Sequence, residues 1–195
     1  MAFKIGCIFL ASGHSKRFRA NKLLSSVGDR TLVDTVFHNH PSELFNQTVV
    51  VTRYAPVAVS AAQCGFSIAE NEDTTDDISK TIRLGLETLR PGMDGCMFSV
   101  CDQPLLTTES VRNLVHAFQA SPDKIAVLSY NGKRGNPAIF PQALFSELEV
   151  LSNGQSGSAV IEKHRELLNL VPVTHRRELI DIDYRRDLET ISEQE

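Results

Sequence analysis

The feature that most constrains the fold of this chain is a short apolar run that leads directly into a basic loop near the amino end. Residues 5–10, IGCIFL, have the length of one buried strand. The chain then turns at Ser12-Gly13, where glycine permits backbone angles that other residues avoid. Backbone N–H groups at such a turn, with long cations beside it, are suited to bind a polyphosphate. A solvated basic loop after an edge strand is the alternative. The basic residues, within seven positions, are Lys16, Arg17, Arg19 and Lys22.

The charge balance of the whole chain favours a small anionic ligand over a long polyanion. The 195 residues carry a formal net charge of −4, so the basic loop stands out against an acidic background and no nucleic-acid partner is expected. No apolar run reaches the roughly 18–20 residues of a membrane span, and no signal-peptide pattern is present, so we expect a cytoplasmic protein without a membrane partner. The four cysteines, at 7, 64, 96 and 101, form no metal-binding spacing and are expected to be buried thiols.

Apolar periodicity along the chain predicts an α/β fold. Helices are expected from Thr31, over 55–63, from about 78, from Thr107 or Thr108, from Pro141 through Leu151, over 158–164 and from about Tyr184. A turn at Asn131-Gly132 leads into a loop at 133–136. This alternation predicts a single three-layer α/β/α Rossmann-like domain over residues 1–195, with a mainly parallel mixed sheet. The expected strands lie at 5–10, 48–52, 66–69, 96–101, 125–130, 137–140, 168–173 and 179–182.

Two candidate site elements follow strands of this predicted sheet. In an open α/β sheet, ligands bind outside the carboxyl ends of the strands. The basic loop follows the first strand, and Asp102 follows the strand at 96–101. A carboxylate at that position can hold Mg²⁺ against phosphate oxygens, or it can be an ordinary loop acid.

The order and spacing of these residues carry a family resemblance. The run Leu10-Ala11-Ser12-Gly13-x-Ser15-x-Arg17, with Lys22 five residues on, resembles the signature L-A-[AGS]-G-x-S-x-R-x-G-x-x-K of small α/β nucleotidyltransferases. The resemblance is strongest to the molybdenum-cofactor cytidylyltransferase and guanylyltransferase group. Cys101-Asp102-Gln103-Pro104 resembles the group's [GC]-D-[QM]-P-x-L element, whose Asp carries the metal. The resemblance implies that the first run and Asp102 bind the nucleotide, that Arg17, Lys22 and Asp102 are catalytic, and that Asp102 binds Mg²⁺.

Two further segments match the group in part. Asn71 and the downstream Thr81-Ile82-x-x-Gly85-Leu86 resemble its N…G-M-x-x-S-I-x-x-G-L segment, which implies that Asn71 and Thr81 lie near the nucleotide. An amphipathic helix with an acidic start is the alternative. The run Gly135-Asn136-Pro137 resembles the G-x-x-G-H-P loop, which implies that these residues face the acceptor substrate. A plain hairpin turn predicts much of the same composition.

The carboxyl-terminal segment adds a second candidate metal ligand. Asp181-Ile182-Asp183, followed by Asp187, resembles the D-[IV]-D-T-P-E-D-[LF] ending of the group. Paired carboxylates at a strand end can supply such a ligand, and Asp183 is the better candidate of the two. A helix-capping Asp is the alternative.

Three positions depart from the group's pattern. Arg19 stands in place of the second Gly of the signature, where a positive φ would cost a non-Gly residue about 1–2 kcal/mol. Asp77 replaces a Gly, and a carboxylate facing a triphosphate would repel it unless it points away or binds a cation. Asn136 replaces the His of the acceptor loop.

The resemblance implies an Mg²⁺-dependent nucleotidyltransferase. It would transfer a nucleoside monophosphate to a phosphate-bearing acceptor such as molybdopterin, with release of pyrophosphate. CTP, as the donor of CMP, is the first candidate for the nucleotide, and GTP is the other. A transient contact with a molybdoenzyme or chaperone would then be expected. One alternative is a transferase of the same fold that acts on a sugar phosphate or methylerythritol phosphate. Another is a catalytically silent nucleotide-binding partner protein of cofactor assembly, which the three departures would favour.

Overall fold

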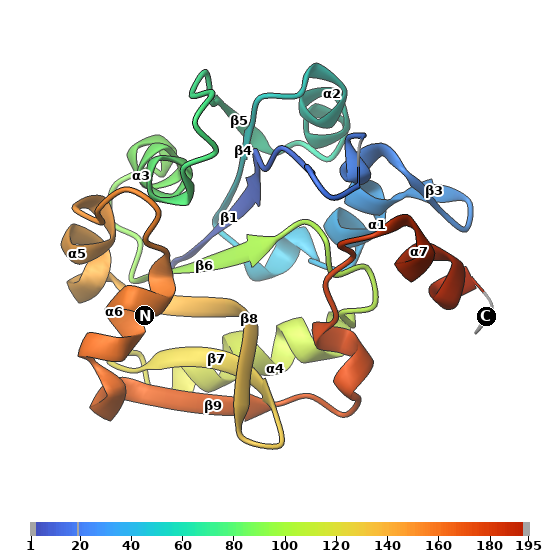
Figure 1. Cartoon of the computed structure of the whole chain (residues 1–195). Helices are drawn as coiled ribbons and strands as arrows, with labels where there is room; N and C mark the ends of the chain where they lie inside the picture. The colour runs from blue at the N-terminus through green and yellow to red at the C-terminus, as the bar shows by residue number, and fades with distance from the viewer. Residues whose placement is uncertain (1–2, 19, 193–195) are drawn as a thin grey trace.

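The computed structural model describes residues 3–18 and 20–192. They form a single α/β domain around one seven-stranded sheet, in the order β5–β4–β1–β6–β8–β7–β9 (Figure 1). β8 runs antiparallel to both of its neighbours and the other pairings are parallel, which confirms the predicted mainly parallel mixed sheet. The strands are β1 (Ile5–Ala11), β4 (Gln47–Thr52), β5 (Ser67–Glu70), β6 (Gly95–Val100), β7 (Ile125–Tyr130), β8 (Lys133–Pro141) and β9 (Leu168–Pro172).

The strand register brings three chain exits to one edge of the sheet. Leu10 of β1 lies opposite Val51 on one side and Val100 on the other, with all three strands parallel. The chain therefore leaves β1, β4 and β6 at the same carboxyl edge. This edge carries the basic loop and Asp102, as the sequence predicted.

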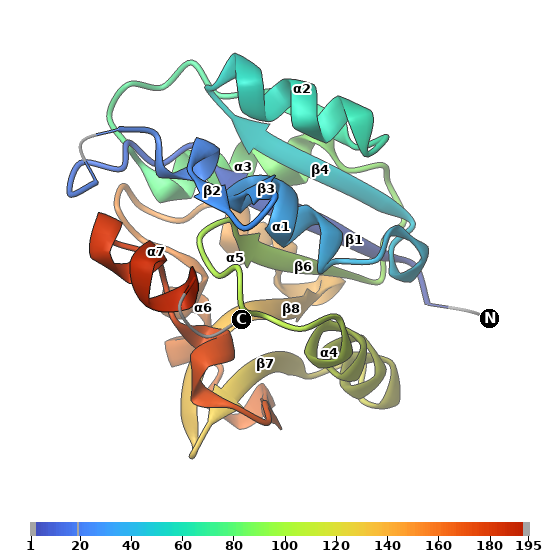
Figure 2. The same ribbon diagram turned by 90° about the vertical axis from the view of Figure 1, so that its right-hand side faces the viewer.

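Helices cover both faces of the sheet because the central strands are apolar on both sides. Side chains such as Phe9 pack with α1 (Leu32–His38), α2 (Ala55–Gln63) and α4 (Thr108–Ala120). Ile8, which points to the other face, packs with α3 (Ile78–Thr88), α5 (Phe145–Glu149) and α6 (Gly157–Lys163). Figure 2 shows α1, α2 and α4 on the side that faces the viewer, with the sheet behind them. The structure thus has the three predicted layers.

Helix α3 lies unusually close to the sheet. A Cβ atom at Gly85 would come within 2.6 Å of Ile8 Cγ2 and within 3.2 Å of Val51 Cγ2. Only glycine permits this approach. It brings the first turns of α3, including Ile78 and Thr81, to the carboxyl edge of β1.

The remaining elements are short and mostly lie at the edges of the domain. They comprise a small hairpin, β2 (Ser26–Val27) and β3 (Arg30–Thr31), and a terminal helix, α7 (Arg185–Ser192), that lies against β2. None of the helices among the described residues is long and apolar enough to cross a bilayer. The described part of the chain also contains five 3₁₀ segments: η1 (Lys22–Leu24), η2 (Ser42–Leu44), η3 (Gln142–Leu144), η4 (Arg165–Leu167) and η5 (Arg176–Leu179).

Some predicted elements near the carboxyl end are wrong. The expected strand at 179–182 does not exist, because Leu179 ends η5 and residues 180–183 are irregular. The expected loop at 133–136 is the first part of β8, which pairs directly with β7 across the Asn131-Gly132 turn. Both turn residues have positive φ, 48° and 75°, which suits the twist of a tight hairpin. Strand pairing, which a local pattern does not reveal, decides both cases.

Two smaller expectations also fail. Pro141 ends β8 rather than opening a helix, since the following turn is η3 and α5 begins only at Phe145, so Leu151 lies beyond that helix. Cys64 is exposed, in contrast to the other three cysteines, because it caps the carboxyl end of α2 at the surface.

Candidate active site

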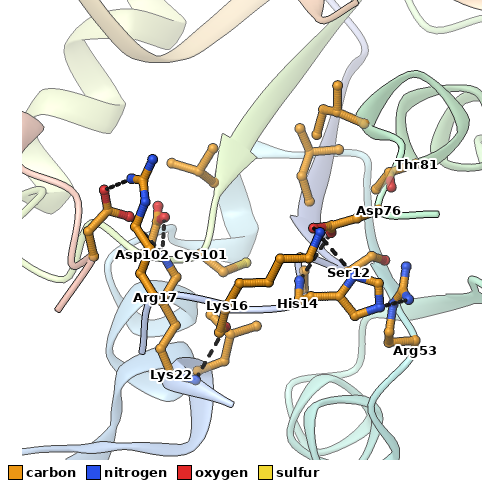
Figure 3. A pocket seen from close by; sticks show the side chains of 18 residues that line it. Ser12, His14, Lys16, Arg17, Lys22, Arg53, Asp76, Thr81, Cys101 and Asp102 are labelled. Atoms are coloured by element: carbon orange, nitrogen blue, oxygen red, sulfur yellow. Dashed lines mark hydrogen bonds and ion pairs between the residues drawn. The ribbon is translucent and has the colours of Figure 1, made fainter. Parts of the chain in front are cut away.

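A cavity of about 300 Å³ opens at the carboxyl edge of β1 and β6 (Figure 3). We call it the basic cavity. Its walls come from the loop after β1, the residue after β4, the start of α3, the two residues after β6 and the segment before α7. Every candidate nucleotide-binding residue except Asn71 lines it, and so does Asp183. The lining residues include Leu10, Ala11, Ser12, Gly13, Ser15, Arg17, Lys22, Thr81, Asp102 and Asp183.

Lys22 and Asp102, 80 positions apart in the chain, meet in this cavity. Lys22 Nζ donates to Asp102 Oδ2 at 2.7 Å and to the carbonyl oxygen of Ile182 at 2.8 Å. Asp183 Oδ1 lies 3.7 Å from the same ammonium group. Lys22 is held in place because it begins η1, where Asn21 caps the turn and Leu23 is buried.

Arg17 lies on the exposed side of the same cluster. Its guanidinium pairs with Asp183 Oδ2 at 2.8 Å. The backbone of Asp183 is fixed in turn by Asp187, whose Oδ2 accepts the N–H groups of Asp183 at 2.9 Å and of Tyr184 at 2.7 Å. The segment before α7 thereby joins the basic loop. We call Arg17, Lys22, Asp102 and Asp183 the Lys22 cluster.

The Lys22 cluster contains oxygen atoms that suit a hard divalent cation. Asp102 Oδ1 is buried and has no hydrogen-bond partner, although its other oxygen is bound by Lys22. Mg²⁺ in enzymes is commonly held by one or two carboxylates together with water and substrate phosphates. Asp102 and Asp183 supply such a pair. Among residues 3–18 and 20–192 no group of three or more His, Cys, Asp or Glu side chains could hold a metal ion.

The other end of the basic cavity contains residues that the sequence analysis did not assign to the site. Asp76 accepts the His14 backbone N–H at 3.1 Å and lies 3.6 Å from Lys16 Nζ. Arg53 contacts His14 Nε2 at 2.6 Å, and because a guanidinium only donates, this nitrogen must be the acceptor. We call these four residues the His14 cluster. Arg53 directly follows β4 at the carboxyl edge, which was the one sequence signal that could have identified it.

The Asp76 carboxylate is held in its charged form. Partial burial by itself would raise the pKa of Asp76, but the hydrogen bond from the His14 backbone N–H, the His14 side chain and the charge of Lys16 outweigh it and lower the pKa. Asp76 also has a positive φ of 64°, a conformation that is uncommon outside glycine but that aspartate and asparagine adopt more often than most residues.

The basic loop obtains its shape from hydrogen bonds rather than from glycine. Ser12 Oγ donates to the carbonyl of Val51 at 3.0 Å, and Tyr54 Oη donates to the carbonyl of Gly13 at 2.9 Å. The expectation that Gly13 supplies a special backbone angle is wrong, since the positive φ in this loop, 51°, belongs to Ser15. A Cβ at Gly13 would meet nothing within 4 Å, so its small size leaves open space beside the backbone. Arg19 lies outside the described residues.

Asn71 and Asp77 have supporting positions beside the cavity. Asn71 is buried and does not line the basic cavity, but its Nδ2 donates to Oγ1 of Thr81, which does, at 3.1 Å. Asp77 is the N-cap of α3 and its Oδ1 accepts from the N–H of Ser79 at 3.0 Å and of Gly154 at 2.9 Å. Hydrogen bonds from the Gly154 N–H and from Ser79 lower the pKa of Asp77, and together they outweigh burial, which by itself would raise it. The carboxylate is therefore an internal cap, and the repulsion of a triphosphate considered above does not arise.

A second, larger cavity of about 610 Å³ adjoins the first and shares Leu10, Ile78 and Val100 with it. We call it the apolar cavity. Its rim includes Gly135 and Asn136 of β8, whereas Pro137 is buried and absent from the lining. The absence of a side chain at Gly135 allows close packing inside the protein, since a Cβ there would lie 2.8 Å from Leu179 Cδ1. The cavity's apolar lining residues include Ile82, Phe98, Val127, Ala138, Phe140, Leu148 and Ile161, and its polar and charged ones are Lys133, Arg134, Asn136, Ser156 and Ser158.

Comparison with known proteins places the chain in a family. The family model described as the MobA-like NTP transferase domain matches residues 7–167. No curated protein sequence matches the chain.

Solved structures share the fold across nearly the whole chain. Rv0371C of Mycobacterium tuberculosis H37Rv, in a complex with manganese, has a TM-score of 0.80, 23% identity, and coverage of 98% of this chain and 100% of that one. A nucleotidyl transferase from Methanothermobacter (Mth528) has a TM-score of 0.83, 17% identity, and coverage of 99% and 98%. A 4-diphosphocytidyl-2C-methyl-D-erythritol synthase from Anaerococcus prevotii DSM 20548 has a TM-score of 0.75, 14% identity, and 98% coverage of both chains.

Proposed function

Because this chain belongs to the MobA-like NTP transferase domain family, we propose that it transfers CMP from CTP to a phosphate-bearing acceptor such as molybdopterin. The basic cavity would hold the nucleotide and the apolar cavity the acceptor. The observation that carries this proposal is the contact between Lys22 Nζ and Asp102 Oδ2 at 2.7 Å, because it joins the two elements of the nucleotidyltransferase resemblance in one site.

The proposed reaction is a displacement at phosphorus. An oxygen of the acceptor phosphate forms a bond to the α-phosphorus of CTP, the bond from that phosphorus to the bridging oxygen of the β-phosphate breaks, and pyrophosphate leaves. The acceptor phosphate is already ionised, so the reaction needs no general base. The main obstacle is repulsion between two anions, which cations and positioning reduce.

Arg17 and Lys22 are the cations that would offset this charge. Both are neutralised by carboxylates in the structure, Arg17 by Asp183 and Lys22 by Asp102. To bind a triphosphate, each must exchange its carboxylate for phosphate oxygens. The neighbouring backbone N–H groups at Ser12 and Gly13, where the cavity leaves space beside the chain, would approach the same ligand.

A divalent cation would make this exchange favourable. Asp102, through its unpartnered Oδ1, and Asp183 are the residues that would hold it, and the ion would neutralise phosphate oxygens when bound. We propose Mg²⁺ for this role. The Rv0371C structure, whose fold this chain shares, contains manganese, which supports a divalent cation in this fold.

The apolar cavity offers both apolar surface and polar side chains to an acceptor. A sugar phosphate or methylerythritol phosphate buries hydroxyl groups that need hydrogen-bond partners. Aliphatic and phenylalanine side chains line part of this cavity, and Lys133, Arg134, Asn136, Ser156 and Ser158 line the rest with groups that can bind hydroxyl or phosphate oxygens. The shared residues Leu10, Ile78 and Val100 mark the boundary at which acceptor and nucleotide would meet.

Two measurements test the proposal. Each of CTP, GTP, ATP and UTP is first added with Mg²⁺, and the nucleotide bound in the basic cavity is expected to raise the Tm by mass action. Pyrophosphate release is then measured with molybdopterin, a sugar phosphate and methylerythritol phosphate as acceptors. Release with CTP and molybdopterin supports the proposal. Release only with one of the other acceptors favours the alternative transferase, and nucleotide binding without release from any acceptor favours a silent binding protein.

A further inference from the structure

Glu178 is a buried carboxylate outside both cavities, and its contacts join the carboxyl-terminal part of the chain to α4. Its residue is only 2% exposed. Oε2 accepts from Thr107 Oγ1 at 2.7 Å and from Ser110 Oγ at 2.5 Å, while Oε1 accepts the His175 N–H at 3.2 Å. Thr107 is the N-cap of α4, so the Glu178 charge lies at the positive end of that helix.

The residues after Glu178 cross the carboxyl end of β6 without a regular strand to hold them. We call residues 178–183 the docking segment. Gln103 Nε2 donates to Asp181 Oδ1 at 2.8 Å, and the Ile182 N–H donates to the Asp102 carbonyl at 2.8 Å. The Ile182 side chain is fully buried in the core. These contacts attach the docking segment directly to the loop that carries Asp102.

The docking segment supplies two contacts of the Lys22 cluster. The Ile182 carbonyl accepts from Lys22 Nζ at 2.8 Å, and the Asp183 carboxylate pairs with Arg17 at 2.8 Å. The docking segment is held both by these contacts in its middle and by contacts at its two ends. One end is fixed by Glu178 and the other by Asp187, which accepts the Asp183 N–H.

We propose that Glu178 is a positioning residue that docks residues 180–183 so that Asp183 and the Ile182 carbonyl lie beside Asp102 and Lys22. The inference rests on the proposed function in so far as Asp102 and Asp183 are taken to hold the metal of the nucleotide complex. Glu178 itself touches neither cavity lining. Its effect passes through the backbone of the docking segment.

The charge state of Glu178 agrees with this role. Burial by itself would raise the pKa of Glu178, but the hydrogen bonds from the Ser110 and Thr107 hydroxyls outweigh it and lower the pKa. Glu178 is therefore ionised at neutral pH. Its removal would leave two hydroxyl donors without their acceptor at the end of α4.

The test compares Glu178→Ala with Val115→Ala, a control in the core of the same helix α4 whose residue is 1% exposed. Amide hydrogen exchange is measured at Ile182, and Mn²⁺ affinity is measured in the presence of CTP. In Glu178→Ala we expect exchange to accelerate and Mn²⁺ affinity to fall, each by about tenfold, the ratio for losing one hydrogen bond to a charged group. Val115→Ala lowers the Tm but should change neither quantity.

Two further variants keep the result interpretable. Glu178→Gln retains an acceptor oxygen for the hydroxyls and should restore most of the protection at Ile182. Ser110→Ala removes one donor, keeps the carboxylate, and should give an intermediate effect even if Glu178→Ala fails to fold. The inference would be overturned if folded Glu178→Ala kept wild-type protection of Ile182 and wild-type Mn²⁺ affinity. If Glu178→Ala does not fold, the same result in both Glu178→Gln and Ser110→Ala would overturn it. A wild-type protein that binds no CTP would refute the proposed function instead, and exchange at Ile182 would still decide the role of Glu178.

Discussion

The Lys22 cluster and the His14 cluster lie at opposite ends of one cavity, and in each a lysine is paired with an aspartate, yet their surroundings differ. The Lys22 side chain is 15% exposed and its ammonium contacts groups from two other segments. The Lys16 side chain is 75% exposed and reaches Asp76 only at 3.6 Å. Exposed ion pairs contribute little because water and salt screen them. Burial, rather than the number of charges, should therefore decide which end performs chemistry.

The largest expected effect on activity comes from replacing one carboxylate with an amide at each end of the basic cavity. Asp102→Asn should lower metal-dependent turnover by about 10³-fold, because it removes the charge of the proposed metal ligand and leaves Lys22 without its closest anion. Asp76→Asn, the matched variant in the His14 cluster, keeps an oxygen that can accept the His14 N–H and should retain most activity. The measurement is pyrophosphate release over an Mg²⁺ titration. Equal losses in the two variants would contradict the distinction between the clusters.

The next effect concerns the cations. Lys22→Ala should lower kcat by about 10²–10³-fold, the usual scale for losing one electrostatic stabiliser of a transition state. Lys16→Ala removes the same charge from the exposed end of the cavity and serves as the control. Steady-state kinetics with CTP separates the two. Activity of Lys22→Ala within threefold of the wild type would remove Lys22 from the mechanism.

A smaller effect, opposite in sign, is expected for metal affinity without nucleotide. Lys22 Nζ occupies the space between Asp102 Oδ2 and Asp183 Oδ1, the two carboxylates proposed to hold the cation. Lys22→Met should therefore bind Mn²⁺ about fivefold more tightly than the wild type, as expected for removing one partly exposed competing charge. Electron paramagnetic resonance of free Mn²⁺ measures this directly. An equal gain in Lys16→Met would mean that the general field of the cavity, and not the position of Lys22, is responsible.

The smallest effect is a pH-dependent change in stability at the edge of the Lys22 cluster. Partial loss of water and the nearby Asp102 carboxylate raise the pKa of Asp181. A folded-state pKa above the unfolded value means that Asp181 favours folding most at low pH and loses this contribution as pH rises through the raised pKa. Asp181→Asn should thus give a small rise in Tm at pH 7. Thermal unfolding at pH 7 and pH 3 checks the sign, since the benefit should vanish at the lower pH.

Local sequence patterns were sufficient for the strands that are buried on both faces of the sheet. The β-branched run before Thr52 and the apolar run before Ala11 predicted β4 and β1, because buried parallel strands need such residues on both faces. The segment 179–182, LIDI, was also expected to be a strand. In the structure the docking segment is irregular, because Glu178 and Gln103 tie it to α4 and to the loop after β6. Those contacts join residues about 70 to 80 positions apart, which no local pattern contains.

The candidate site likewise has some features that the sequence predicted and others that only contacts between distant segments determine. By itself the sequence determined which charged residues follow strands at the carboxyl edge, and so placed the basic loop and Asp102 together. Only the tertiary structure decided that Asp77 is an internal cap, that Ser15 rather than Gly13 has the left-handed backbone, and that Arg53 and Asp76 form the far end of the cavity. The reason is physical. Strand order and residue type follow from short-range sterics and burial, whereas the partner of a charge depends on which distant segments pack beside it.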